Sequence, residues 1–303
     1  MKKSFFVVLT LFIFTSVISL AQTKVPDPAT FPLSARALGL GKAFVGQVDD
    51  VGALYSNPAG IAAITKWQSC LLYGDLPNDY RYLTIATAYP TDYGIFSAGL
   101  TASGQSGNYD NKAAILAYSV ELKRFMAGIS YKDHGGGVGK ELDLGLIFKL
   151  NRWLTFGTAI QKSIEMTGHP AVWKNGAVVN LLGQKNSLKE LAGQDLKLYF
   201  AQDSFPTIKD QTPISYSGIE WQPMKILALR AGFDQNLRTY GVGVELGGYN
   251  FDYAAYFRDN ITGAINNVFS ISFQTEILSS KGEDKRINFQ DAARQRRMFV
   301  PRY

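Results

Sequence analysis

The chain has 303 residues, of which 46% are hydrophobic and 13% aromatic, and it carries 29 glycines, one cysteine and a formal net charge of +6. A single cysteine excludes an intrachain disulfide framework. After residue 20 no apolar run approaches the roughly 20 residues of a transmembrane helix, so the sequence excludes the helical class of membrane protein.

Residues 1–21 have the pattern of a secretory signal peptide. Two lysines precede an apolar run over 5–20, and residues 19–21 have the small-x-small form of a cleavage site. A membrane anchor is the alternative, but the run is shorter than a comfortable span of roughly 20 residues. We therefore expect an exported chain that begins near Gln22.

Residues 22–66 form a long segment ahead of the first expected strand. Its part 31–64 is rich in small residues and turn formers, and its defining positions are Ser34, Arg36, Gly39, Gly41, Lys42, Phe44, Asp49, Asp50, Tyr55, Asn57, Pro58 and Gly60. Lys42 is either a ligand-facing charge or a partner of Asp49 or Asp50, and the cost of an unpaired charge favours the pairing. In the turn 57–60, Pro58 presets the backbone and Gly60 allows a sharp exit toward the first strand.

Period-2 alternation of apolar and polar residues predicts strands from residue 67 onward. In 141–149, for example, one face carries three leucines and a phenylalanine, and the other carries Glu141, Asp143 and Lys149. The expected strands are 67–74, 81–89, 94–102, 112–121, 124–132, 141–150, 152–162, 213–222, 224–233, 239–247, 249–258 and 266–276.

The alternation by itself fits a soluble sandwich as well as a membrane barrel. Two further features favour the barrel. Most of the strands reach the ~9–11 residues that cross a bilayer at a tilt, whereas globular strands average about 5–6. Short and long connections also alternate along the chain, as in outer-membrane barrels, which puts the short turns and both chain ends on one side of the membrane.

The stretch 163–212 is too long for an ordinary loop. It contains two weaker strand candidates, 176–182 and 196–201, and a hairpin there would raise the count from twelve to an even fourteen. Between them Ser187 and Glu190 fit a capping box, so a short helix in an outer loop is equally allowed, and a solvated loop is the third alternative.

Charged residues on the polar faces of the strands are expected to point into the lumen. They include Glu121, Lys132, Lys149 and Glu276, and the candidate site residues among them are Glu141, Asp143, Arg230, Glu245, Asp252 and Arg258. Opposite charges on neighbouring strands, such as Arg230 with Asp252, can pair and brace the barrel interior. We favour this structural role over ligand binding.

The segment 277–303 is a basic tail at the short-turn side. From Lys281 to Tyr303 it holds seven Lys or Arg against three acidic residues. Nucleic acid is a poor partner for an exported chain, so the tail either docks on a protein or an anionic surface in the periplasm or is disordered without a role.

The sequence contains no complete enzyme motif. Gly39-Leu40-Gly41-Lys42 lacks the first glycine and the Ser or Thr of a phosphate-binding loop, and Phe44 occupies the third glycine position of a dinucleotide motif. The two histidines, His134 and His169, lie far apart in loops and support neither a zinc site nor a catalytic triad. We therefore expect no catalysis, no cofactor and no metal.

Four sequence elements follow one another in the N-terminal part of the chain: Ser34-Ala35-Arg36-Ala37-Leu38-Gly39-Leu40-Gly41, Ala43-Phe44-Val45, Asp49-Asp50 and Ala53-Leu54-Tyr55-x-Asn57-Pro58-Ala59-Gly60. In this order they resemble the N-terminal signature of the PorV/PorQ group. These barrels are related to the fatty acid transporter FadL, and the last strands of the chain also look like theirs. The resemblance implies a hatch in the lumen formed by residues 31–64. Lys42 departs from the small residue common in the PorV-like members.

Together these features predict an all-β fold, a transmembrane antiparallel β-barrel of about 12–14 strands over 67–276 with an N-terminal hatch or plug in the lumen. The resemblance implies an accessory role in type IX-like protein secretion at the outer membrane, with secretion-system proteins or secreted cargo as partners. A FadL-like channel for small hydrophobic compounds is the alternative, and a soluble periplasmic sandwich is the third. Outer-membrane lipid is an expected partner of either barrel, and nucleic acid is not.

Overall fold

The computed structural model describes residues 34–46, 48–76, 79–105, 108–135, 139–165, 171–183, 187, 189–190, 193–206, 212–234, 237–258 and 265–275. The expected signal peptide and basic tail lie outside these residues. Within them, none of the helices has the length and apolar character to span a bilayer.

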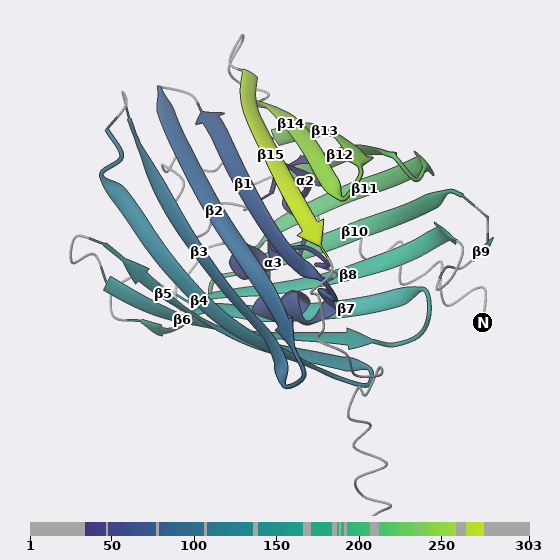
Figure 1. The fold of residues 1–303 in the computed structure, drawn as a ribbon, viewed down its shortest axis with the longest axis horizontal. Coiled ribbons are helices and arrows are strands. Elements are labelled where there is room, and N and C mark those ends of the chain that lie inside the picture. Colours follow the sequence, from purple (N-terminus) through teal and green to yellow (C-terminus); the bar gives the residue numbers. More distant parts are fainter. Residues whose placement is uncertain are drawn as a thin grey trace, which may run out of the picture.

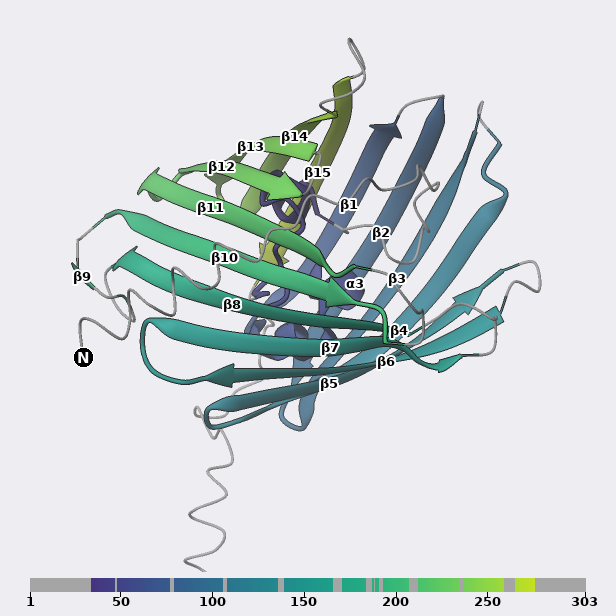
Figure 2. The ribbon, with the colours of Figure 1, turned by 180° about the vertical axis from the view of Figure 1, so that it is seen from behind.

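The described chain forms one antiparallel sheet that closes on itself (Figures 1 and 2). The long strands are β1 (Trp67–Leu76), β2 (Tyr80–Thr91), β3 (Gly94–Gln105), β4 (Asn111–Leu122), β5 (Phe125–His134), β6 (Gly139–Lys149), β7 (Leu154–Glu165), β8 (Val172–Gly183), β10 (Asp195–Ser204), β11 (Ile214–Met224), β12 (Leu227–Asp234), β13 (Leu237–Leu246), β14 (Tyr249–Arg258) and β15 (Ile265–Thr275). Each pairs with its neighbours in sequence, β1 pairs with β15, and β8 pairs with β10. The two-residue β9 (Lys189–Glu190) only adds to the end of β8, so the barrel has fourteen strands.

The apolar faces of the strands point outward, away from the barrel interior. Leu100 and Leu116, near the middle of their strands, are 61% and 62% exposed. On β6 the leucines face outward, while Glu141 and Asp143 are buried inside. An apolar exterior around a closed sheet is stable in a bilayer, where every strand must have its backbone hydrogen bonds satisfied. This pattern excludes the soluble sandwich.

Aromatic pairs mark the end of the barrel where the turns are short. Ring centroids of neighbouring strands lie 4.9 Å apart for Phe96 and Tyr118 and 4.7 Å apart for Phe125 and Phe148. These four rings all sit near that end of their strands, where β3 and β5 begin and β4 and β6 finish. Such a belt is typical of the level at which a barrel meets the lipid headgroups.

The weak hairpin expected within 163–212 is real and consists of β8 and β10. It makes the strand count fourteen and divides the long stretch, so that β8 finishes and β10 begins at the same end of the barrel as the short turns. The helix allowed by the capping box is not formed at 189–190, which are extended in β9. The Ser187 hydroxyl donates to the carbonyls of Gly183 and Lys189 instead of capping a helix.

Residues 34–64 contact inward-facing residues on opposite sides of the barrel. This segment contains α2 (Ala35–Gly39), α3 (Ala53–Ser56) and the 3-10 helix η1 (Pro58–Ala63), drawn in purple in Figure 1. Helix α2 packs against β12–β15, and η1 packs against β3–β6. Most of its apolar side chains are buried and form one cluster with inward-facing residues of the strands.

A ring of glycines in the barrel wall brings this segment into backbone contact with the strands. A β-carbon added at any of them would come within 3.1 Å of a backbone atom of residues 34–64, and the members are Gly128, Gly145, Gly157, Gly176, Gly218, Gly232 and Gly241. Six of them form directly opposed pairs on neighbouring strands: Gly128 with Gly145, Gly157 with Gly176, and Gly218 with Gly232. The absence of side chains at the glycine ring therefore creates the room in which the segment lies.

Candidate functional site

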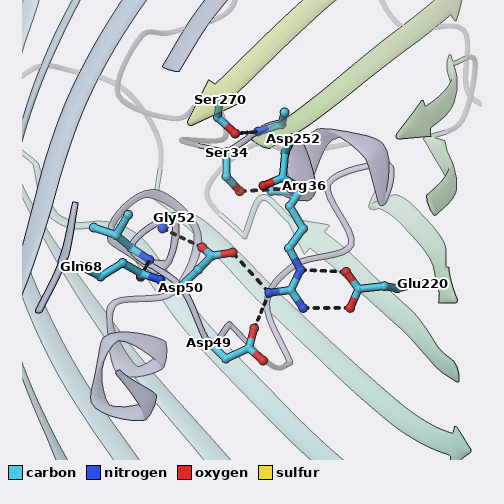
Figure 3. A network of polar contacts seen from close by, with 12 residues as sticks. Ser34, Arg36, Asp49, Asp50, Gly52, Gln68, Glu220, Asp252 and Ser270 are labelled. Carbon is cyan, nitrogen blue, oxygen red and sulfur yellow. Dashed lines mark hydrogen bonds and ion pairs between the residues drawn. The ribbon is translucent and has the colours of Figure 1, made fainter. Parts of the chain in front are cut away.

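Arg36 is the centre of a charged network at the α2 end of the segment (Figure 3). Its Nε and Nη2 donate to the two carboxylate oxygens of Glu220 on β11, both at 2.8 Å. Its Nη1 donates to Asp49 at 2.5 Å and to Asp50 at 3.3 Å. Tyr199 on β10 donates its hydroxyl to Glu220 at 3.1 Å. One guanidinium thus joins two parts of the segment to the barrel wall.

The network continues along the wall from β11 to β14. Arg230 on β12 donates to Glu220 at 2.7 Å and to Asp252 on β14 at 2.6 Å. The strand between them, β13, carries Gly243 at this point, and a β-carbon there would meet both the Arg230 guanidinium and the Asp252 carboxylate. The predicted pairing of Arg230 with Asp252 therefore forms, and it does so by passing over a glycine.

Neutral polar groups fix the backbone around the charges. Ser34 caps α2 by accepting from the Ala37 amide, and the Ala35 amide donates to Ser270 on β15. The Val51 amide donates to the Gln68 side chain on β1 at 2.7 Å. These contacts hold the ends of the charged stretch at separate places on the wall.

A polar cavity of about 270 Å³ lies beside this network. Arg36, Asp49 and Asp50 line it from the segment, and Glu245 lines it from β13. A second hollow, of about 530 Å³, is lined by Gly247 in the β13–β14 turn. Glu245 and the turn Lys225–Ile226 line both the hollow and the cavity. The cavity therefore continues to the short-turn rim of the barrel.

The two adjacent carboxylates of the segment differ in acidity. Burial raises the pKa of Asp50 to about 6, with Arg36 opposing the rise and the charge of Asp49 adding to it. For Asp49, burial again acts to raise the pKa, but Arg36 and Lys197 outweigh it and the pKa is lowered. Asp50 is the carboxylate of this pair that titrates close to neutral pH.

The far end of the segment is held by neutral hydrogen bonds. The Asn57 side chain accepts from the Ala59 amide and donates to the Val45 carbonyl at 3.0 Å, which closes the chain on itself. Ser119 on β4 donates to the Pro58 carbonyl at 2.6 Å. Gln161 on β7 donates to the carbonyl of Tyr55, also at 2.6 Å. The opposite sides of the barrel thus hold the segment by different chemistry.

The other motif residues occupy distinct places. Gly39 and Gly41 lie against β13 and β12, where the Thr239 hydroxyl donates to the Gly39 carbonyl. Lys42 has a left-handed φ of 65°, and Phe44 lies beneath the Arg36 guanidinium at 5.2 Å. Gly60 is inside η1, not at a sharp exit, and its lack of a side chain makes room for Val48.

Glu141 and Asp143 do not join the Arg36 network. They belong to a second buried set on β5–β7, in which Lys132 pairs with Asp143 at 2.6 Å and Lys162 pairs with Glu141 at 3.3 Å. Glu245 lines the cavity near the rim, and the Arg258 side chain lies outside the described residues. No group of three or more His, Cys, Asp or Glu in the described part of the chain is placed to hold a metal ion.

Two features of the Arg36 network were not predicted from the sequence. Asp49 and Asp50 both pair with Arg36, a partner that the sequence analysis did not consider, whereas their pairing with Lys42 stays a prediction. Glu220, which joins both arginines, was missed altogether. The alternation of the strand did indicate its direction, because Glu220 stands between the outward-facing Ile219 and Trp221 and must therefore point inward.

Comparison with solved structures supports the barrel. The Pseudomonas putida toluene transporter TodX matches with a TM-score of 0.56 and 15% identity, over 83% of this chain and 100% of that one. The Ralstonia pickettii toluene transporter TbuX matches with a TM-score of 0.55 and 13% identity over the same shares. The Acinetobacter baumannii outer membrane protein Omp33 gives a TM-score of 0.50 at 8% identity, over 69% of this chain and 98% of that one.

These identities establish a shared fold alone. No protein-family model matches the sequence, and a search of curated proteins finds no match. The similar solved structures are transporters and membrane proteins, not enzymes. By its fold and its apolar exterior, the chain is a bacterial outer-membrane β-barrel.

Proposed function

We propose that this barrel is an outer-membrane channel for small hydrophobic compounds, of the FadL-like kind. One observation carries the proposal: its fold corresponds to two toluene transporters over their entire length. A porin-like role for polar solutes is less well supported, because residues 34–64 contact opposite walls of the barrel and reduce the space for a water-filled passage.

In this proposal residues 34–64 act as the hatch that closes the lumen. Support comes from the glycine ring, which brings the segment into backbone contact with β5–β8 on one side of the barrel and β11–β13 on another. The Arg36 network adds charged contacts to β11, and the hydrogen bonds of Ser119 and Gln161 add contacts to β4 and β7. A wide barrel without such a filling would be an open channel.

Uptake by whole cells tests the transport proposal. The full chain is expressed in a bacterial host that lacks a hydrocarbon channel, and the initial rate of uptake of radiolabelled toluene is measured. We expect a severalfold increase over cells that produce a narrow structural barrel at equal abundance. Equal rates in the two strains would contradict the proposal.

A second candidate is an accessory barrel in protein secretion, of the PorV/PorQ type. The ordered signature at 34–60 favours it, and so does the charged interior. The buried pairs Lys132–Asp143 and Arg230–Glu220 would present ionised groups to any apolar solute crossing the lumen. Secretion-system proteins or secreted cargo would then be the partners.

The two candidates differ in what accompanies the barrel. Affinity purification of the full chain from its native membrane, after mild crosslinking, should recover secreted cargo or other secretion components only if the second candidate holds. Unchanged toluene uptake together with recovered cargo would favour the accessory role. Raised uptake without cargo would favour the channel.

A further inference from the structure

The segment 34–64 is held by two kinds of contact that respond differently to solution conditions. At the glycine ring, backbone lies on backbone, and no titratable group takes part. At the other contact, beside the polar cavity, the Val51 amide donates to Gln68 on β1, and Asp49 and Asp50 pair with Arg36, which binds Glu220 on β11. A change of pH can therefore act on the second contact without disturbing the first.

Asp50 is placed to sense such a change. Its Oδ1 accepts from the Gly52 amide at 2.7 Å, and its Oδ2 lies 3.3 Å from Arg36. Its side chain is 16% exposed and lines the cavity that continues to the short-turn rim. Water and protons can thus reach a carboxylate that is otherwise buried.

We propose that Asp50 is a proton-binding site, reached through this cavity, whose occupancy sets how tightly residues 48–52 are held against the barrel wall. The ligand is the proton itself, supplied from the short-turn side. The proposal does not depend on which compound or partner the barrel handles.

The charges around Asp50 come from every element packed against this stretch. The acidic groups and the thiol are Asp49, Glu220 on β11, Glu245 on β13, Asp252 on β14 and Cys70 on β1. The basic groups are Arg36 on α2, Lys197 on β10, Lys225 in the β11–β12 turn and Arg230 on β12. Three carboxylates share Arg36, and Asp50 lies at the longest of the three distances. The negative charge of Asp50 is therefore the one that Arg36 balances least.

The direction of the effect follows from proton linkage. Because burial raises the pKa of Asp50 to about 6, the closed arrangement binds a proton more tightly than an arrangement in which Asp50 is in water. Lowering the pH therefore favours the closed arrangement, and raising it through 6 favours release of 48–52 into the cavity. With an ordinary Asp pKa in the released state, the equilibrium shifts by about tenfold between pH 5 and pH 7.

Cys70 provides a built-in reporter. It is the one cysteine of the chain, it lines the same cavity, and it is 3% exposed. In detergent-solubilised full chain, its rate of modification by dithiodipyridine is measured relative to the urea-unfolded chain at the same pH, which removes the intrinsic reactivity of the thiol. We expect this ratio to fall about tenfold from pH 7 to pH 5.

Two variants complete the test. Asp50→Asn should show a pH-independent ratio close to the wild-type value at pH 5. Glu121→Gln is the matched control and should keep the wild-type pH dependence, because Glu121 pairs with Lys149 and does not line the cavity. A flat wild-type profile, or the same fall in Asp50→Asn, would overturn the proposal.

A measurement on the wild type alone tests the proposal even if the variants fail to fold. Hydrogen exchange of the peptide containing Val51 and Gly52, corrected for the intrinsic pH dependence of exchange, should be about tenfold slower at pH 5 than at pH 7. Equal corrected rates would overturn the proposal as well.

Discussion

Arg36 and Glu220, separated by 184 positions in the chain, meet in a two-pronged ion pair with both distances at 2.8 Å. The pair joins the N-terminal segment to a strand in the last third of the sequence. Both side chains are largely shielded from water, at 14% and 2% exposure. A buried carboxylate shared by two arginines is costly to remove, since the two positive charges then face each other with one negative charge fewer to balance them.

Glu220→Gln should therefore destabilise the barrel strongly. We expect a loss of roughly 3–5 kcal/mol in the free energy of unfolding, because Arg36 and Arg230 remain buried with reduced compensation. Urea unfolding in detergent micelles, followed by heat-modifiable gel mobility, measures the loss. The matched control is Glu121→Gln, whose partner Lys149 is 43% exposed and which should cost about 0–1 kcal/mol. Equal effects of the two changes would contradict the assigned role of Glu220.

Adding a methyl group to the glycine ring should disturb the seating of the segment. A β-carbon at Gly128 would overlap the backbone of Pro58, and one at Gly232 would overlap that of Gly41. Gly128→Ala and Gly232→Ala should each cost about 1–3 kcal/mol of unfolding free energy. Gly135→Ala is the control, because its β-carbon would meet only ordinary contacts at 3.5 Å. Wild-type stability of both ring variants would show that the segment is not seated as described.

A charged residue on the outward face should destabilise the barrel by an amount that depends on how deep the residue lies in the bilayer. Leu116, in the middle of β4, is 62% exposed, and Leu122, at the end of the same strand, is 55% exposed. Leu116→Arg should cost about 2–4 kcal/mol and Leu122→Arg about 0–1 kcal/mol in refolding titrations with lipid vesicles. Equal costs would mean that the middle of β4 does not lie at the centre of the membrane.

The pH dependence of stability should carry the signature of Asp50. Its pKa is raised by burial to about 6, so its contribution to stability grows as the pH falls through 6 and is complete below the ordinary Asp value. Asp50→Asn should therefore gain up to about 3 kcal/mol over the wild type at pH 8, and this gain should shrink toward zero near pH 4. A constant difference between the two proteins across this range would contradict the assignment.

Much of the barrel could be predicted because its signals are local. Alternation at 141–149 identifies β6 and the face that carries Glu141 and Asp143, and the structure places both inside. The weaker candidates 176–182 and 196–201 were harder to recognise because apolar residues occupy both faces of β8 and β10, as in Val178-Val179 and Tyr199-Phe200. Their pairing with each other and with their neighbours, which the sequence cannot display, makes them strands.

The candidate site was less predictable because its contacts are long-range. The Asp49–Asp50 pair suggested a nearby cation, and Lys42 is closer in sequence to both than Arg36, yet α2 directs Arg36 toward them. Gly60 looked like a turn residue, whereas close approach of Val48 explains its small size. Such roles depend on which backbones meet inside the barrel, and no local pattern encodes that.

Ion conductance in a planar lipid bilayer tests whether residues 34–64 close the lumen. The full chain is compared with a variant lacking 31–64, after heat-modifiable mobility has shown that both barrels are folded. We predict no steady conductance for the full chain and a stable, porin-like conductance for the deletion variant. A folded deletion variant that conducts no more than the full chain would contradict the claim.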